Sequence, residues 1–270
     1  MLLKERLKKI DKTLIMGIIN VTPDSFSDGG HFLTPKKALD HAYQLIDDGA
    51  DILDIGGESS RPGATPVPLA DEVDRILPVI KLLKKHTTIH LSVDTYKSEV
   101  MQIVLDEGVE MINDIKALTS NNSLSVVSNF SNALVTLMHM KGTPADMQNN
   151  PTYNNPIELV IKKFLQERIN SCKEGGISKD RIIIDPGFGF GKTMEHNWQL
   201  FKNINTFTDI GCPVLIGISR KRMLKDLVGD NLTDLDKSSA FFANILAQRG
   251  SGIIRTHNVS LTKKFLETSL

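Results

Sequence analysis

Short apolar runs alternate along this chain with segments that carry apolar residues at helical spacing. The eight apolar runs are rich in β-branched residues, and each predicts a buried strand. The expected strands cover residues 14–19, 52–55, 89–93, 110–112, 133–138, 181–184, 214–218 and 251–255. The expected helices begin after Thr34-Pro35 and then cover 71–85, 98–107, 124–130, 157–173, 196–203, 236–248 and 261–266. Repeated β/α units without a domain-sized linker predict an α/β protein, a (β/α)8 TIM barrel that forms a single domain over residues 1–270.

The first expected strand is followed by an unusually long loop. It runs for about fourteen residues to Thr34-Pro35, where two to six residues are usual. Its composition is that of a loop, and it carries polar groups and the aromatic residue Phe26. Such a segment is either a lid or binding loop or a disordered surface excursion, and its length favours the functional interpretation.

Polar residues follow the carboxyl end of every expected strand. In a TIM barrel the functional residues lie at this end. An Asp after a strand is often only a helix cap, and a lone His is often a satisfied polar group, but capping alone does not explain eight such ends. These residues are Asn20, Glu58, Ser59, Ser60, Arg61, Asp94, Asn113, Asp114, His139, Asp185, Ser219, Arg220, Lys221, Arg255 and His257.

Part of this set suits a flat heterocycle. Asp94, Asn113 and Asp185 offer hydrogen-bond acceptors and an amide, which match the donor-rich edge of an aminopyrimidinone ring. Buried carboxylates need such donors or a cation. Lys221 is placed to meet the acceptor side of the same ring.

A second part suits a phosphorylated tail. Arg61, Arg255 and His257 are expected to form a cationic group. Asn20 is a poor metal site alone, but one side-chain oxygen together with substrate phosphates is a usual way to hold Mg²⁺. No His/Cys cluster has zinc spacing, and no Ser-His-Asp arrangement stands out.

The segment Pro186–Thr193, PGFGFGKT, resembles a Walker A loop without matching it. Its first required glycine position is Pro186, and the third glycine of a dinucleotide fingerprint would fall on Lys192. We interpret it instead as a flexible loop that places Gly187 and Phe188 beside Asp185.

Composition excludes several classes of partner. Lys+Arg and Asp+Glu balance at 32 each, so there is no basic field for nucleic acid or an anionic membrane. Cys172 and Cys212 are isolated thiols without a disulfide framework. No signal peptide and no membrane-length apolar stretch is found, so a cytosolic location is expected.

Eight blocks of sequence together resemble the dihydropteroate synthase family. They are MGIINVTPDSFSDGG, DIGGESSRPGA, SVDTYKSEV, MINDI, LMHMKGTP, IIIDPGFGFGKTMEHN, PVLIGISRK and RTHNV, which begin at residue 16 and end just past His257. The resemblance implies a TIM-barrel enzyme, usually a homodimer, that takes two small-molecule substrates. It would condense 6-hydroxymethyl-7,8-dihydropterin pyrophosphate with 4-aminobenzoate to 7,8-dihydropteroate and pyrophosphate, with Mg²⁺, and sulfonamides would compete for the aminobenzoate site.

The resemblance also implies roles for individual residues. The pterin would be bound by Asp94, Asn113, Ile115, Met138, Asp185, Lys221 and Arg255. The aminobenzoate would be bound by Ser25, Phe26, Ser60, Arg61, Pro62, Phe188 and Ser219. The pyrophosphate would be bound by Asn20, Arg61, Arg255 and His257, with Asn20 also reaching Mg²⁺. Asp185, Lys221, Arg255 and His257 would be the catalytic residues.

Three positions depart from the pattern usual in the family. Asn258 stands where Asp is common, Ser60 where Thr is common, and Lys116-Ala117 lies in a variable segment. We expect the first departure to weaken the orientation of His257. Two alternatives share the fold: a pterin-dependent methyltransferase, and a paralogue that binds pterin without catalysis. The intact loops around Arg61 and His257 argue against both.

Overall fold

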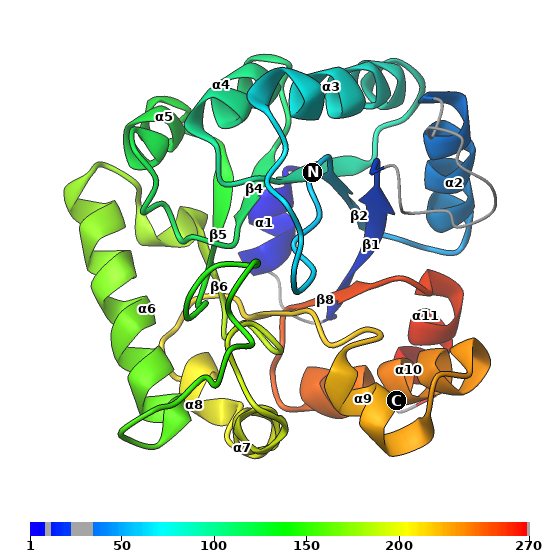
Figure 1. Ribbon diagram of the computed structural model, residues 1–270. Helices are drawn as coiled ribbons and strands as arrows, with labels where there is room; N and C mark the ends of the chain where they lie inside the picture. The colour runs from blue at the N-terminus through cyan, green and yellow to red at the C-terminus, as the bar shows by residue number, and fades with distance from the viewer. Residues whose placement is uncertain (9–11, 23–34, 269–270) are drawn as a thin grey trace.

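Eight parallel strands form a single sheet that curves into a barrel (Figure 1). The computed structural model describes residues 1–8, 12–22 and 35–268. The strands are β1 (Leu14–Asn20), β2 (Ile52–Gly56), β3 (His90–Asp94), β4 (Met111–Asp114), β5 (Leu134–Met138), β6 (Ile182–Asp185), β7 (Leu215–Ile216) and β8 (Ile253–Thr256). Their order is β6-β5-β4-β3-β2-β1-β8-β7, and a bridge between Ile184 and Val214 brings the two edges together. The predicted TIM barrel is confirmed.

Helices surround the barrel, except the first one, which lies across one end (Figure 1). They are α1 (Leu3–Lys8), α2 (Pro35–Asp47), α3 (Leu69–His86), α4 (Ser98–Asp106), α5 (Ser123–Asn129), α6 (Ile157–Glu174), α7 (Met194–Lys202), α8 (Asn205–Thr208), α9 (Arg222–Val228), α10 (Leu232–Gln248) and α11 (Val259–Glu267), with a 3-10 turn at Lys179–Arg181. Each expected helix is present with shifted ends. The pattern of apolar residues missed the short helices α1, α8 and α9, which span too few turns to show a periodicity. In the described part of the chain, no helix is long and apolar enough to cross a membrane.

The strands divide their side chains between two environments, because successive residues point to opposite faces. Outward residues such as Ile15, Leu53 and Ile55 pack with the helices in the main core. Inward residues from the amino-terminal halves of the strands form a separate apolar cluster. Nearer the carboxyl ends, the inward positions become polar. The register places Asn20 beside Gly56, Gly56 beside Asp94, and Asp94 beside Asn113.

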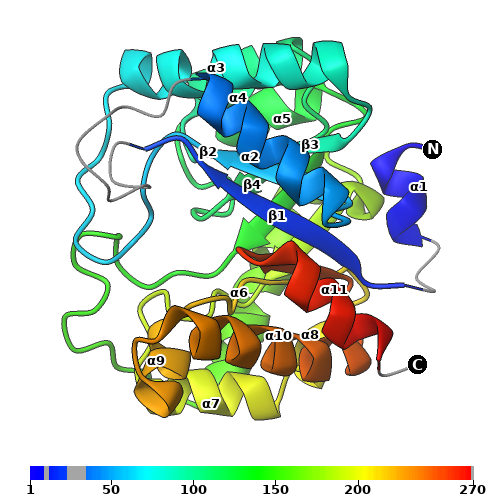
Figure 2. The ribbon, with the colours of Figure 1, turned by 90° about the vertical axis from the view of Figure 1, so that its right-hand side faces the viewer.

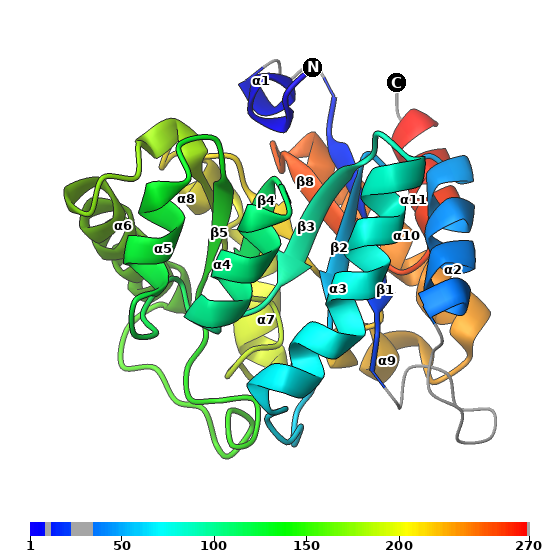
Figure 3. The same ribbon diagram turned by 90° about the horizontal axis from the view of Figure 1, so that it is seen from above.

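Helix α1 closes the amino-terminal end of the barrel. Its Leu3 and Leu7 belong to the inward apolar cluster, and Arg6 pairs with Asp51, which also accepts a hydrogen bond from the Ile15 amide at 2.9 Å. Figures 2 and 3 show α1 at one end of the barrel and the loops after β2 and β5 at the other. Any ligand of the barrel interior therefore enters from the carboxyl end.

The two cysteines form no disulfide, as the sequence predicts. Cys172 and Cys212 are free and buried, and burial raises the pKa of both thiols, that of Cys172 to about 11.

Candidate active site

An ion-pair network lies inside the barrel at its carboxyl end. Arg255 Nε donates to Asp54 Oδ2 at 2.6 Å, and Arg255 Nη2 donates to Asp94 Oδ2 at 3.1 Å. Asn113 Nδ2 donates to the same Asp54 oxygen at 3.0 Å. The four residues come from β2, β3, β4 and β8. The structure thus brings together three predicted pterin-binding residues and adds Asp54, which is fully buried.

Asp54 is not among the predicted site residues, because it lies within an apolar run. A signal was present, since Asp54 stands two residues before Gly56 and therefore shares the inward face of β2 with the strand end. Asp54 Oδ1, Ser92 Oγ and Thr136 Oγ1 are buried without a hydrogen-bond partner among the described residues. Such atoms are where ordered water or a polar ligand binds.

Asp185, which is buried, and Lys221, which is half-buried, carry opposite charges in the site. Asp185 Oδ1 accepts a hydrogen bond from the Gly187 amide at 2.7 Å. Burial raises the pKa of Asp185 to about 6 against the lowering effects of that bond and of Lys221. Burial likewise lowers the pKa of Lys221 to about 8, and its ammonium lies 4.0 Å from the centre of the Phe190 ring. Burial raises the pKa of Asp94 to about 7, although Arg255 opposes the rise.

The aromatic ring that reaches the site from the β6 loop is Phe190. Phe188, which was predicted to line the aminobenzoate pocket, is 1% exposed and packs in the main core. Phe190 instead joins Ile115 and Met138 in a small separate cluster, so these two predicted pterin-lining residues lie together. The two-residue offset arises from the loop backbone, where glycines 187, 189 and 191 all have positive φ.

Lys192 holds this loop rather than a phosphate. Its buried ammonium donates to the carbonyl oxygens of Phe190 at 2.9 Å and His139 at 3.2 Å, and lies 3.1 Å from His139 Nδ1. Gly187 packs so close that a Cβ would lie 2.0 Å from the His139 carbonyl oxygen. The loop that we expected to be flexible is therefore tied to the loop after β5. Burial lowers the pKa of Lys192 to about 7.

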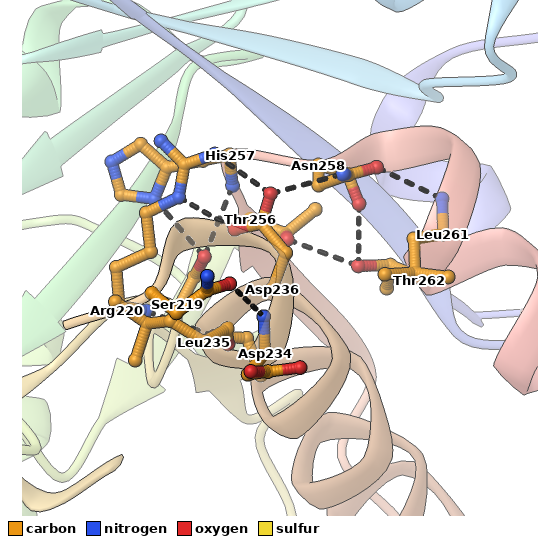
Figure 4. A network of polar contacts seen from close by, with 12 residues as sticks. Ser219, Arg220, Asp234, Leu235, Asp236, Thr256, His257, Asn258, Leu261 and Thr262 are labelled. Carbon is orange, nitrogen blue, oxygen red and sulfur yellow. Dashed lines mark hydrogen bonds and ion pairs between the residues drawn. The ribbon is translucent and has the colours of Figure 1, made fainter. Parts of the chain in front are cut away.

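His257 and Ser219 meet at the ends of β8 and β7 (Figure 4). Ser219 Oγ lies 3.0 Å from His257 Nδ1 and accepts a hydrogen bond from the His257 amide at 3.2 Å. Burial, together with the charges of Arg220, Arg255 and Arg61, lowers the pKa of His257 to about 3. This shift favours a neutral imidazole near pH 7, and the predicted role of His257 in binding phosphate stays a prediction.

The loop after β2 carries three predicted aminobenzoate residues. Arg61 and Pro62 are exposed and Ser60 is half-buried, so their side chains remain accessible. Lys97 anchors the base of this loop, with Nζ 2.6 Å from Glu58 Oε2 and 2.7 Å from the Val67 carbonyl oxygen. Two further predicted residues, Ser25 and Phe26, lie outside the described residues.

Asn20 ends β1 on the same rim and is half-buried. Among the described residues, no group of three or more His, Cys, Asp or Glu side chains has the arrangement of a metal site. One amide oxygen fits an ion that is held mainly by substrate phosphates, and it does not fit a metal held by the protein alone.

Comparisons with known proteins agree with this geometry. Residues 16–257 match the family described as pterin binding enzyme. The dihydropteroate synthase of Haemophilus influenzae is 43% identical over 253 residues, which cover 94% of this chain and 91% of that protein. The dihydropteroate synthase of Escherichia coli is 40% identical over 248 residues, which cover 92% and 87%.

Solved structures of dihydropteroate synthases are similar to this chain. The Yersinia pestis dihydropteroate synthase with a sulfonamide drug complex has a TM-score of 0.91 at 39% identity, covering 95% of this chain and 93% of that one. The Xanthomonas albilineans enzyme in complex with 7,8-dihydropteroate has a TM-score of 0.86 at 40% identity, covering 96% and 93%. The match favours neither the methyltransferase nor the non-catalytic paralogue. This chain belongs to the dihydropteroate synthase family.

Proposed function

We propose that this dihydropteroate synthase works by an SN1-like path, in which pyrophosphate leaves the pterin methylene carbon before the nitrogen of 4-aminobenzoate attacks. The observation that carries this proposal is the convergence of Asp94, Asn113 and Asp185 with Arg255 and Lys221 at one end of the barrel. Carboxylates gathered there would lie against a ring that becomes positively charged.

One group of residues would bind the pterin ring. Asp185 would accept hydrogen bonds from the donor edge of the ring and favour positive charge that spreads over ring and methylene. Lys221 is held beside Phe190, from which its ammonium can donate to the acceptor side of the ring. Ile115, Met138 and Phe190 provide the apolar surface for the flat faces.

A second group of residues would bind the leaving group. Asn20, Arg61, Arg255 and His257 would bind the pyrophosphate, and Arg255 is already held in place by Asp54 and Asp94. A dianionic phosphate next to the neutral His257 would raise the pKa of its imidazole, so that a second donor forms where charge grows. Mg²⁺, which Asn20 would help to hold on the phosphates, supplies further charge neutralisation when bound.

The aromatic amine needs no strong base, because it is neutral near pH 7 and its lone pair is free. Ser60, Arg61, Pro62 and Ser219 would bind the aminobenzoate, with Arg61 available for its carboxylate. The loop after β2 would help to keep water away from the pterin cation, and the predicted role of the loop after β1 falls on residues 23–34, outside the described part of the chain.

The experiment is to measure pyrophosphate release from the pterin pyrophosphate with Mg²⁺, with and without 4-aminobenzoate. We expect 7,8-dihydropteroate to form only when the amine is present. Because the leaving group departs first, we also expect a slower pyrophosphate release without the amine, in which water captures the pterin cation. Tight binding of the pterin pyrophosphate without formation of dihydropteroate would contradict the proposed function, and the complete absence of release without the amine would contradict the SN1-like path. A homodimer in the cytosol also stays a prediction, and sedimentation of the purified protein tests its assembly.

A further inference from the structure

The turn between Ser219 and Lys221 has an unfavourable backbone conformation. Arg220, which lies between them, has φ of 56°, in the left-handed region that non-glycine residues rarely adopt. Such a conformation is strained and persists where the surroundings hold it, often at functional sites. The turn matters because Ser219 contacts His257, and Lys221 begins the approach to α9.

Helix α10 holds this turn at two points. The Arg220 amide donates to Ser239 Oγ at 3.0 Å. The guanidinium donates to both oxygens of Asp236, with Nε 2.6 Å from Oδ1 and Nη2 2.9 Å from Oδ2. Asp236 and Ser239 are 7% and 3% exposed, and a bidentate pair of this kind fixes orientation as well as position.

Asn258, in the loop after β8, forms a hydrogen bond with the same carboxylate (Figure 4). Its Nδ2 donates to Asp236 Oδ2 at 3.0 Å, while its Oδ1 caps α11 by accepting from the Leu261 amide at 3.0 Å. We expected Asn258 to affect the orientation of His257. Its side chain instead bonds to Asp236 and Leu261, and the His257 ring contacts Ser219. An Asp at position 258 could still accept the hydrogen bond that caps α11, but it could not donate to Asp236. In this chain, residues 236 and 258 together carry one negative charge, on Asp236.

We infer that Asp236 is a positioning residue, whose carboxylate holds the Arg220 turn so that Lys221 and Ser219, and through Ser219 also His257, keep their places in the site. We further infer that the Arg220 turn is held when either residue 236 or residue 258 is a carboxylate, so that the negative charge can lie on either residue. Position 258 lies only two hydrogen bonds from the guanidinium, through the Asp236 oxygen that both share. The inference rests on the proposed roles of Lys221 and His257.

The test compares Asp236→Asn with the exchanged pair Asp236→Asn/Asn258→Asp. The control is Asp234→Asn, the same change on the same helix at a side chain that is 54% exposed. The steady-state kinetics of pyrophosphate release and the thermal midpoint are measured for each variant, with the rate expressed per folded protein. Activity of the unmodified protein tests the proposed function separately, so failure of the inference and failure of the function are distinguishable.

We expect Asp236→Asn to lower kcat/KM about 10- to 100-fold, as displacement of catalytic groups by about 1 Å does. Asp234→Asn should leave it unchanged, and the exchanged pair should recover most of the loss. An exchanged pair that folds but is as inactive as Asp236→Asn would overturn the inference, as would an Asp236→Asn protein with unchanged kcat/KM. If Asp236→Asn does not fold, the exchanged pair decides: a folded, active protein supports the inference, and any other result contradicts it.

Discussion

The substitution Asp54→Asn removes the charge that organises the floor of the site. Asp54 is fully buried, and its Oδ2 accepts hydrogen bonds from Arg255 at 2.6 Å and from Asn113 at 3.0 Å. The asparagine keeps one acceptor and loses the negative charge. Among the described residues, Arg255 then keeps one ion pair, with Asp94 at 3.1 Å.

The expected loss of stability depends on how far Asp94 still neutralises Arg255. Breaking a buried ion pair by removing one partner costs about 3–5 kcal/mol, because the remaining charge stays buried. Since Arg255 keeps Asp94, we expect the lower end, about 3 kcal/mol. For a chain of this size that corresponds to a thermal midpoint lowered by roughly 6–12 °C.

A double-mutant cycle separates the ion pair from general damage to the core. Urea unfolding is followed by circular dichroism for Asp54→Asn, Arg255→Met and the double variant, with the exposed Asp234→Asn as a control that should change stability by less than about 0.5 kcal/mol. Removing both charges should cost less than the sum of the single losses by at least about 1 kcal/mol. Additive losses would show that Asp54 and Arg255 do not stabilise each other, and the reasoning would be refuted.

Four further predictions concern charged residues of the site and its metal ion. Asp185→Asn should lower kcat/KM roughly 10²–10³-fold with an unchanged circular dichroism spectrum, and near-normal turnover would remove Asp185 from the mechanism. Because burial raises the pKa of Asp185 from 3.8 to about 6, the native protein binds this proton more tightly than the unfolded chain. The free energy of unfolding should therefore fall from about pH 4 to 6 relative to Asp185→Asn, and a constant difference would contradict the assignment. Burial lowers the pKa of Lys192 from 10.5 to about 7, so the unfolded chain binds more protons above that pH. The free energy of unfolding should rise from about pH 7 to 10 relative to Lys192→Met, measured by the same unfolding assay. Removal of Mg²⁺ with a chelator should stop pyrophosphate release, and added Mg²⁺ should restore it; full activity in the chelator would exclude the metal.

The sequence predicted the barrel because the strands are buried on both faces and appear as apolar runs. It also predicted which end of the barrel is functional, because Asn20, Asp94 and Asp185 are the last residues of their strands. The alternation of inward and outward residues, counted back from Gly56, would also have identified Asp54. The position of Asp54, two residues before Gly56, is therefore a signal of an inward-facing residue that the sequence contains.

Other features had no local signal. The contact between Lys192 and His139 joins residues 53 positions apart, and nothing near either residue indicates its partner. Phe188 and Phe190 are equivalent in sequence, and only the turns of the glycine-rich loop decide which ring enters the core. Such choices depend on tertiary packing.

Asn258 shows why a departure from a family pattern cannot be interpreted one position at a time. Considered alone, the loss of an acid beside His257 suggests a weakened site. In the structure an acid is present, on Asp236 of a different helix, and Asn258 supplies the donor that this acid accepts. Hydrogen bonds from Arg220 and Asn258 outweigh burial and keep the pKa of Asp236 below its ordinary value, so the charge is secure. What the turn at Arg220 requires is one ionised carboxylate within reach, and two neighbouring positions can satisfy that requirement. A substitution that looks like a loss at residue 258 is thus half of a pair, and its effect depends on residue 236.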